Sequence, residues 1–276
     1  MNNFSVTNLL DTYSIKRLFD IFENEAKEVR LVGGCIRDAL SGKETKDIDV
    51  AAKVQPDEII RILDKHKIQY ENFAYKYGSI IAIIEDQKFQ ITTLREDFNQ
   101  MGRHTNIFFT DDWKKDAERR DFTINAMYLS SDGTIKDYFN GQRDIAESKL
   151  QFIGNIDERI QEDYLRIFRY YRFLGIFHKP QLIDGYEKIL KRYCLESFNY
   201  LSNDLMRQEI LKMFNTSYPL NSFFNNKDNK EKRFWIELTK NHFVKTQYDL
   251  GLNKCFLLNM LALHIKDAKF WGVAKR

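Results

Sequence analysis

Two aspartates separated by one residue, Asp47 and Asp49, are the side chains whose spacing first suggests chemistry. On an extended strand, residues two apart project to the same face, so both carboxylates would lie together with Ile48 buried behind them. Adjacent carboxylates repel each other unless a cation lies between them, and hard oxygen ligands favour Mg²⁺. The pair predicts a magnesium site, although this short pattern alone is a weak signal.

A glycine pair upstream of these aspartates could hold a phosphate. Gly33 and Gly34 stand between a predicted strand, 29–32, and a predicted helix, 35–40, and Arg37 follows one turn later. Glycine lets an anion approach the backbone, and the helix amino terminus and the arginine add N–H donors. A tight turn that needs glycine for its backbone alone is the other interpretation. A phosphate cradle beside a metal-binding carboxylate pair is what nucleotidyl transfer requires.

A third cluster contains Arg119, Arg120, Asp121 and Asn125. The arginines could clamp a triphosphate while Asp121 or Asn125 hydrogen-bonds a ribose hydroxyl. A surface patch of ion pairs at the start of a strand explains the same residues equally well.

The fourth cluster lies in 159–173, which has the spacing of a helix. Asp163, Arg166 and Arg169 are three residues apart and would share one helix face, which Arg172 extends. An aspartate beside an arginine offers acceptors and donors that can mimic the pairing partner of a base. Ion pairs on the solvated side of a helix are the alternative.

The elements that must position these clusters fall into two parts. Up to about residue 140, short strands alternate with helices. Strands are expected at 29–32, 47–52, 79–84, 88–93 and 135–138, a strand or short helix at 122–129, a helix at 56–67 and a loop at 97–104. After residue 141 the spacing is helical, at 159–173, 186–193, 205–214, 232–238 and 252–266, with a flexible loop at 221–230.

Composition fits a globular protein, since 43% of the 276 residues are hydrophobic and 14% are aromatic. Residues 151–276 carry 21 basic and 14 acidic side chains, whereas residues 1–150 carry 22 and 26. An acidic part joined to a basic part suits a metal site beside a polyanion-binding surface, but it also occurs in proteins that bind no nucleic acid.

Several classes of protein are not indicated by the sequence. No apolar run is long enough to predict a membrane span, and the first residues do not have the pattern of a secretory signal. The three cysteines, Cys35, Cys194 and Cys255, are far apart and match neither a zinc site nor a disulfide framework. Reduced thiols in a cytoplasmic protein are expected.

Taken in order, the four clusters resemble the class II tRNA nucleotidyltransferases (CCA-adding enzymes) and bacterial poly(A) polymerases, most closely the CCA-adding members. The resemblance covers roughly 29–175. Its motifs are LVGGCIRDAL, KDIDVA, ITTLRED followed by GRH, DAERRDFTINAM, DGTIKDYFNG and RIQEDYLRIFRYYRF.

The resemblance implies roles for single residues in the catalytic half of the site. Asp47 and Asp49 would bind Mg²⁺ in a two-metal mechanism. Gly34 and Arg37, beside Gly33, would contact the incoming triphosphate together with Arg120. In the same motif as Arg120, Asp121 would read the ribose.

The resemblance also implies how a base is chosen. Asp163 and Arg166 would act as an amino-acid template that pairs with CTP and then with ATP. Arg169 and Arg172 would support that template and the phosphates. No nucleic-acid template would be needed.

The implied fold is an α+β nucleotidyltransferase head with a five-stranded mixed sheet at 1–140, followed by an all-α neck and a short body. The neck would occupy 141–215 and carry the nucleotide-selecting helix, and a truncated body at 216–276 would bind tRNA. The implied reaction transfers CMP and AMP from CTP and ATP to the 3′ end of tRNA and releases pyrophosphate. Addition of CC only, poly(A) addition, and a catalytically degenerate tRNA-binding protein are the alternatives. The oligomeric state is left open.

The sequence departs from the family pattern at four places. Gln90 and Met101 stand where the family usually has acidic residues, and Leu205 stands where it usually has an arginine. The sequence ends at Arg276, earlier than family members commonly do, so part of the body and the tail is expected to be missing.

Overall fold

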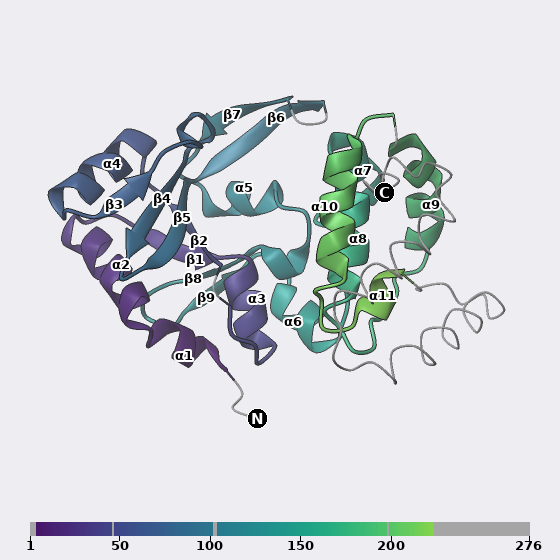
Figure 1. Cartoon of the computed structure of the whole chain (residues 1–276), viewed down its shortest axis with the longest axis horizontal. Coiled ribbons are helices and arrows are strands. Elements are labelled where there is room, and N and C mark those ends of the chain that lie inside the picture. Colours follow the sequence, from purple (N-terminus) through teal and green to yellow (C-terminus); the bar gives the residue numbers. More distant parts are fainter. Residues whose placement is uncertain (1–3, 46, 102–103, 198, 224–276) are drawn as a thin grey trace, which may run out of the picture. The chain divides into compact units, whose positions relative to one another are not determined.

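The computed structural model describes residues 4–45, 47–101, 104–197 and 199–223 (Figure 1). The chain divides into two compact units, one comprising Met1–Asp163 and Gln181–Ile189, the other Tyr164–Pro180 and Leu190–Arg276. The expected head, neck and body at 1–140, 141–215 and 216–276 stay a prediction. The helices expected at 232–238 and 252–266 lie outside the described residues, as does most of the loop expected at 221–230.

The first unit is built on a mixed sheet whose strands run in the order β3-β4-β5-β2-β1-β8-β9. The strands are β1 (Val29–Val32), β2 (Ile48–Ala52), β3 (Gln69–Glu71), β4 (Ser79–Ile84), β5 (Gln87–Thr93), β8 (Met127–Leu129) and β9 (Ile135–Asp137). Strands β2 and β5 are parallel, and all other neighbouring pairs are antiparallel. The sheet has seven strands where the family resemblance implies five. The strand expected at 135–138 is the edge strand β9, the segment expected to be a strand or short helix contains β8, and the three-residue strand β3 at the other edge was not expected.

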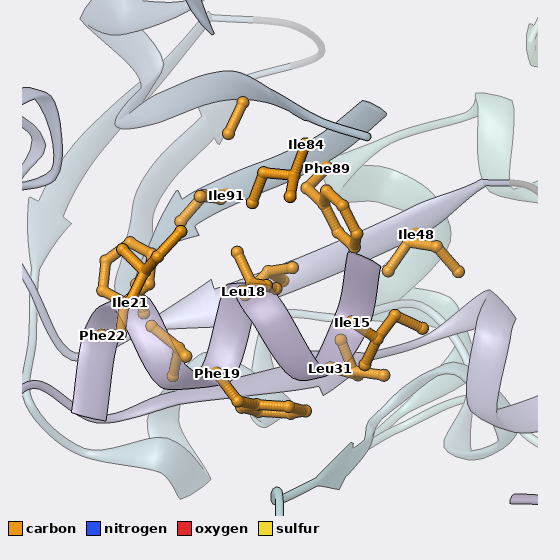
Figure 2. Close-up of a cluster of buried hydrophobic side chains, with 14 of the residues drawn as sticks. Ile15, Leu18, Phe19, Ile21, Phe22, Leu31, Ile48, Ile84, Phe89 and Ile91 are labelled. Atoms are coloured by element: carbon orange, nitrogen blue, oxygen red, sulfur yellow. The ribbon is translucent and has the colours of Figure 1, made fainter. Parts of the chain in front are cut away.

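Four helices supply the side chains that cover one face of this sheet, the first face. They are α1 (Val6–Leu10), α2 (Tyr13–Asn24), α3 (Gly34–Leu40) and α4 (Pro56–Lys65). Figure 2 shows Leu18 and Phe22 of α2 among side chains of the strands, including Leu31, Phe89 and Ile91. Burying these apolar side chains is the main force that fixes the sheet.

Alternation along the strands assigns the next residues to the opposite, second face. Ile48 and Val50 belong to the first-face core, so Asp49 and Ala51 project to the second face. There Ala51 packs with Tyr128 and with Trp113 of α5 (Trp113–Glu118). The predicted carboxylates therefore lie on the less covered side of the sheet.

The loop expected at 97–104 is wrong. Strands β6 (Arg95–Met101) and β7 (His104–Phe109) pair antiparallel as a separate two-stranded sheet. The sequence of β6 is largely polar and lacks the apolar alternation by which a strand is recognised. The strand is evident only from its backbone pairing with β7. Gly102 and Arg103 lie outside the described residues.

The single helix expected at 159–173 is also wrong. Two helices occupy this segment, α7 (Ile156–Glu162) and α8 (Leu165–Leu174). They are separated at Asp163, whose φ of −151° and ψ of 103° are extended. The two helices are fixed by different partners. Arg159 of α7 binds carbonyls in the first unit, whereas the Tyr164 hydroxyl donates to Glu196 in the second at 2.6 Å.

The remaining elements are short or helical. They are the 3₁₀ turns η1 (Tyr75–Tyr77) and η2 (Thr123–Asn125), and the helices α6 (Gly141–Ala146), α9 (Tyr186–Ser197), α10 (Asn203–Met213) and α11 (Pro219–Phe223). Within the described part of the chain, no helix combines the length and apolar character that crossing a bilayer requires.

Candidate active site

The two aspartates lie at the start of β2, next to the glycine turn. Asp47 and Asp49 are exposed and Ile48 is buried, which is the predicted alternation. The register pairs Asp49 with Val32 of β1, the residue directly before Gly33. Burial, and then the nearby charge of Asp49, raise the pKa of the Cys35 thiol in α3 to about 12. Strand pairing therefore brings Asp49 to the turn between β1 and α3.

The donor set at these aspartates fits Mg²⁺ held jointly with a substrate. In the residues that the structure describes, no three His, Cys, Asp or Glu side chains gather closely enough to hold a metal ion by themselves. Mg²⁺ is commonly bound by one or two carboxylates, with substrate phosphates and water completing its coordination. Gln90 of β5 is paired with Asp49 on its other side, so a neutral amide stands beside that carboxylate.

The glycine turn is shaped by its backbone. Gly33 has φ +79° and ψ −122°, a conformation that side-chain-bearing residues rarely adopt, and its N–H donates to the Met127 carbonyl at 3.2 Å. A Cβ added at Gly33 would lie 3.7 Å from Nη1 of Arg120, and one added at Gly34 would lie 3.5 Å from Nη2 of Arg37. Two predicted phosphate-binding arginines thus flank the turn.

Asn125 connects two of the other predicted residues. Arg37 Nη1 donates to Asn125 Oδ1 at 2.7 Å, and Asn125 Nδ2 donates to Asp121 Oδ1 at 3.3 Å. The backbone N–H of Phe122 donates to the same Asp121 oxygen at 2.9 Å. The structure therefore brings Gly33, Gly34, Arg37, Arg120, Asp121 and Asn125 together, with Asn125 acting as a bridge between the arginine and the aspartate.

Asp116 of α5 is a residue that the sequence reasoning missed. It is 1% exposed and accepts hydrogen bonds from Arg119 Nε at 2.8 Å, Arg120 Nη2 at 3.1 Å and the Tyr128 hydroxyl at 2.7 Å. Burial alone would raise the pKa of Asp116, but Arg120 and Arg119 hold it well below its ordinary range. The spacing of three and four residues to the arginines was the available signal.

Arg159 is a second residue that the sequence reasoning missed. Its side chain on α7 is nearly buried, and Nη2 donates to the backbone carbonyls of Arg119 and Arg120, at 2.6 Å each. The segment that carries Arg120 is thus held from two directions, through its backbone by Arg159 and through its side chain by Asp116.

The predicted nucleotide-selecting residues do not share one helix face. Asp163 follows α7 in an extended conformation, whereas Arg166, Arg169 and Arg172 lie on α8. Arg172 stacks over Phe173 at 4.4 Å, and its Nε lies 3.2 Å from the buried carboxylate of Glu209 on α10. Arg172 therefore joins two helices of the second unit, and base selection by the other three residues stays a prediction.

The chain is similar in sequence to known proteins. Residues 29–151 match the model of the poly A polymerase head domain. The chain is 46% identical over 173 residues to the human mitochondrial CCA tRNA nucleotidyltransferase 1, covering 62% of this chain and 40% of that protein. It is 36% identical over 148 residues to the CCA-adding enzyme of Enterococcus faecalis, covering 53% and 36%. The chain thus spans less than half the length of these relatives.

Solved structures have a similar fold. The Bacillus stearothermophilus CCA-adding enzyme in complex with CTP aligns with TM-score 0.66 and 23% identity, over 76% of this chain and 51% of that one. The Thermotoga maritima CCA-adding enzyme complexed with tRNA aligns with TM-score 0.62 and 25% identity, over 88% and 57%. The α+β fold with a mixed sheet is confirmed.

Proposed function

We propose that this chain, whose residues 29–151 match the model of the poly A polymerase head domain, transfers CMP and AMP from CTP and ATP to the 3′ end of tRNA and releases pyrophosphate. The observation that carries the proposal is the pairing of Asp49 with Val32, which puts the carboxylate beside the glycine turn that Arg37 and Arg120 flank. The names of the relatives and the bound CTP and tRNA of two similar structures support it.

In this proposal the first unit binds the reacting phosphates. Asp47 and Asp49 would hold Mg²⁺, whose charge would make the attacking hydroxyl easier to deprotonate and would offset charge on the phosphates. The glycines admit the triphosphate close to the backbone, and Arg37 and Arg120 donate hydrogen bonds to it. Preorganised donors act without having to reorient during the reaction.

Other residues would read the sugar and the base. Asp121 accepts from the ribose hydroxyl, in an orientation that Asn125 and the Phe122 N–H support. Asp163 and Arg166 would present acceptors and donors to the base, and Arg169 and Arg172 would support that template and the phosphates. Arg172 is itself held by Glu209. Arginine presents several N–H donors in a rigid plane, which suits a base edge.

Sequencing of product ends tests the proposal. The protein is incubated with tRNA lacking CCA, Mg²⁺ and CTP alone, ATP alone, or both. We expect CC ends with CTP alone and CCA ends with both nucleotides. No incorporation of either nucleotide refutes the proposal, CC ends that never gain A identify a CC-adding enzyme, and long A tails on a generic RNA identify a poly(A) polymerase.

One observation favours a candidate of another class, a tRNA-binding protein that has lost catalysis. Gln90, a neutral residue, is the strand partner of Asp49. This candidate predicts tight tRNA binding with no incorporation, and binding that is unchanged in Asp49→Ala.

A cytoplasmic location also stays a prediction, because the human relative is named as mitochondrial.

A further inference from the structure

The guanidinium of Arg120 has a specific orientation within the first unit. Nη2 donates to Asp116 Oδ2 at 3.1 Å, and Nε donates to the Tyr128 hydroxyl at 3.2 Å. The third nitrogen, Nη1, lies 3.7 Å from the position of a Cβ at Gly33. Two nitrogens are thus engaged by protein partners, and the third is beside the glycine turn.

Both partners of Arg120 are themselves fixed. Tyr128 in β8 is fully buried, and its hydroxyl donates to Asp116 Oδ2 at 2.7 Å, so the three side chains form a closed set of hydrogen bonds. The Tyr128 ring packs edge-on against Trp113 at 5.4 Å. A guanidinium tied at two nitrogens has little rotational freedom left to lose when it binds an anion.

Charge balance leaves this group able to attract a phosphate. Asp116 accepts from Arg119 as well as from Arg120, so one carboxylate serves two guanidinium groups. Asp97 lies 3.9 Å from Arg119 and 3.3 Å from Arg95, so the cluster contains three arginines and two aspartates. Three positive charges against two negative ones leave a net positive charge, and in a poorly solvated environment that charge attracts an anion more strongly than it would in water.

We propose that Asp116 and Tyr128 are positioning residues, which hold Arg120 so that its Nη1 edge meets the triphosphate at the glycine turn. The inference deepens the proposed function and rests on it for the identity of the nucleotide. Neither residue contacts the nucleotide, and both act through Arg120.

Calorimetry on the full chain tests the inference with two ligands, CTP with Mg²⁺ and cytidine, which lacks phosphates. In Tyr128→Phe the Arg120 Nε loses its acceptor, so the guanidinium is held less firmly. We expect the Kd for CTP to rise about tenfold, which corresponds to Arg120 losing one hydrogen bond to the charged triphosphate. The Kd for cytidine stays unchanged. Asp116→Asn should weaken CTP binding at least as much. In a protein that already carries Arg120→Lys, Tyr128→Phe should change the Kd for CTP less than it does in the wild type.

Tyr138→Phe is the matched control. Its ring lies 6.2 Å from that of Tyr128, but Tyr138 is 36% exposed, and we expect both dissociation constants to match the wild type. If Tyr128→Phe and Asp116→Asn, verified as folded, bind CTP as the wild type does, the inference is overturned. Equal weakening for CTP and cytidine overturns it too, because that indicates a general structural defect. A wild type that binds CTP but adds no nucleotide to tRNA refutes the proposed function and leaves the inference standing.

Discussion

Gly33 and Gly34 are adjacent in the sequence, yet their replacements should differ. Gly33 has φ +79°, so Gly33→Ala strains the backbone, and we expect a loss of about 1–3 kcal/mol in the free energy of unfolding. Gly34 begins α3, and a Cβ there is in ordinary contact with Arg37 only, at 3.5 Å. Gly34→Ala should be close to neutral in urea unfolding. Equal stability of the two variants would contradict the assigned role of the turn.

The buried carboxylate of Asp116 predicts a specific dependence on pH. Its pKa is depressed below the ordinary 3.8, so it contributes stability above that pH, which is lost as pH falls through the folded-state value. We expect Asp116→Asn to be less stable than the wild type by about 3 kcal/mol at neutral pH. The gap should narrow in acid below pH 3.8.

Urea unfolding of both proteins at a series of pH values measures that gap, with replacement of the exposed Asp20 of α2, Asp20→Asn, as the control. A gap that is constant down to strong acid would mean that the charge of Asp116 contributes no stability. A gap that widens in acid would reverse the sign of the assigned pKa shift.

Residue types and spacing were enough to single out the six site residues that the first unit brings together. They did not indicate that Asn125 is a bridge, because Asn125 meets Arg37, 88 positions away in the chain, and local spacing contains no signal for such a contact. For Asp116 the spacing to Arg119 and Arg120 did contain a signal, which the sequence reasoning did not use, whereas nothing indicated its contact with Tyr128 of β8.

Helix α7 contacts the backbone of the segment that carries Arg120. Arg159 donates to two carbonyls of the segment that carries Arg120, and these acceptors would be left poorly satisfied without it. We expect Arg159→Met to lower the free energy of unfolding by about 2 kcal/mol or more. Arg143→Met is the matched control, because Arg143 pairs with Glu147 on an exposed surface and should change stability by about 0.5 kcal/mol or less.

The same two variants show whether the two carbonyl contacts of Arg159 stabilise the protein more than an exposed ion pair does. Chemical denaturation gives the free energies, and the Kd for CTP reports on Arg120. If Arg159→Met is as stable as Arg143→Met, the two carbonyl contacts contribute nothing and α7 has no special role.

Sequence patterns located most elements of the first unit and failed where the physical cause was not local. Strands β1, β4 and β5 and helix α4 were predicted because their apolar residues recur with the period of the element. The turn at Glu85 and Asp86 was predicted too, and both residues have positive φ. The hairpin of β6 and β7 was missed because it is polar, and the break at Asp163 because helical spacing continues through it.

For the whole molecule, the charge difference between the two parts of the sequence agrees with the proposed division of labour. The acidic part contains the predicted metal site, and the basic part follows it with the arginines of α8. Polyanion binding by that part should weaken steeply as salt rises, because counterions are released on binding. A tRNA affinity that is independent of salt would contradict a role for this charge.

We propose that Asp47 and Asp49 hold the metal for nucleotide addition. The initial rate of CTP incorporation into tRNA lacking CCA tests this role, for wild type, Asp49→Asn and Asp20→Asn. We expect Asp49→Asn to be at least about 100-fold slower with unchanged unfolding, since Asp49 is exposed, and Asp20→Asn to match the wild type. Incorporation by Asp49→Asn at the wild-type rate would contradict the claim.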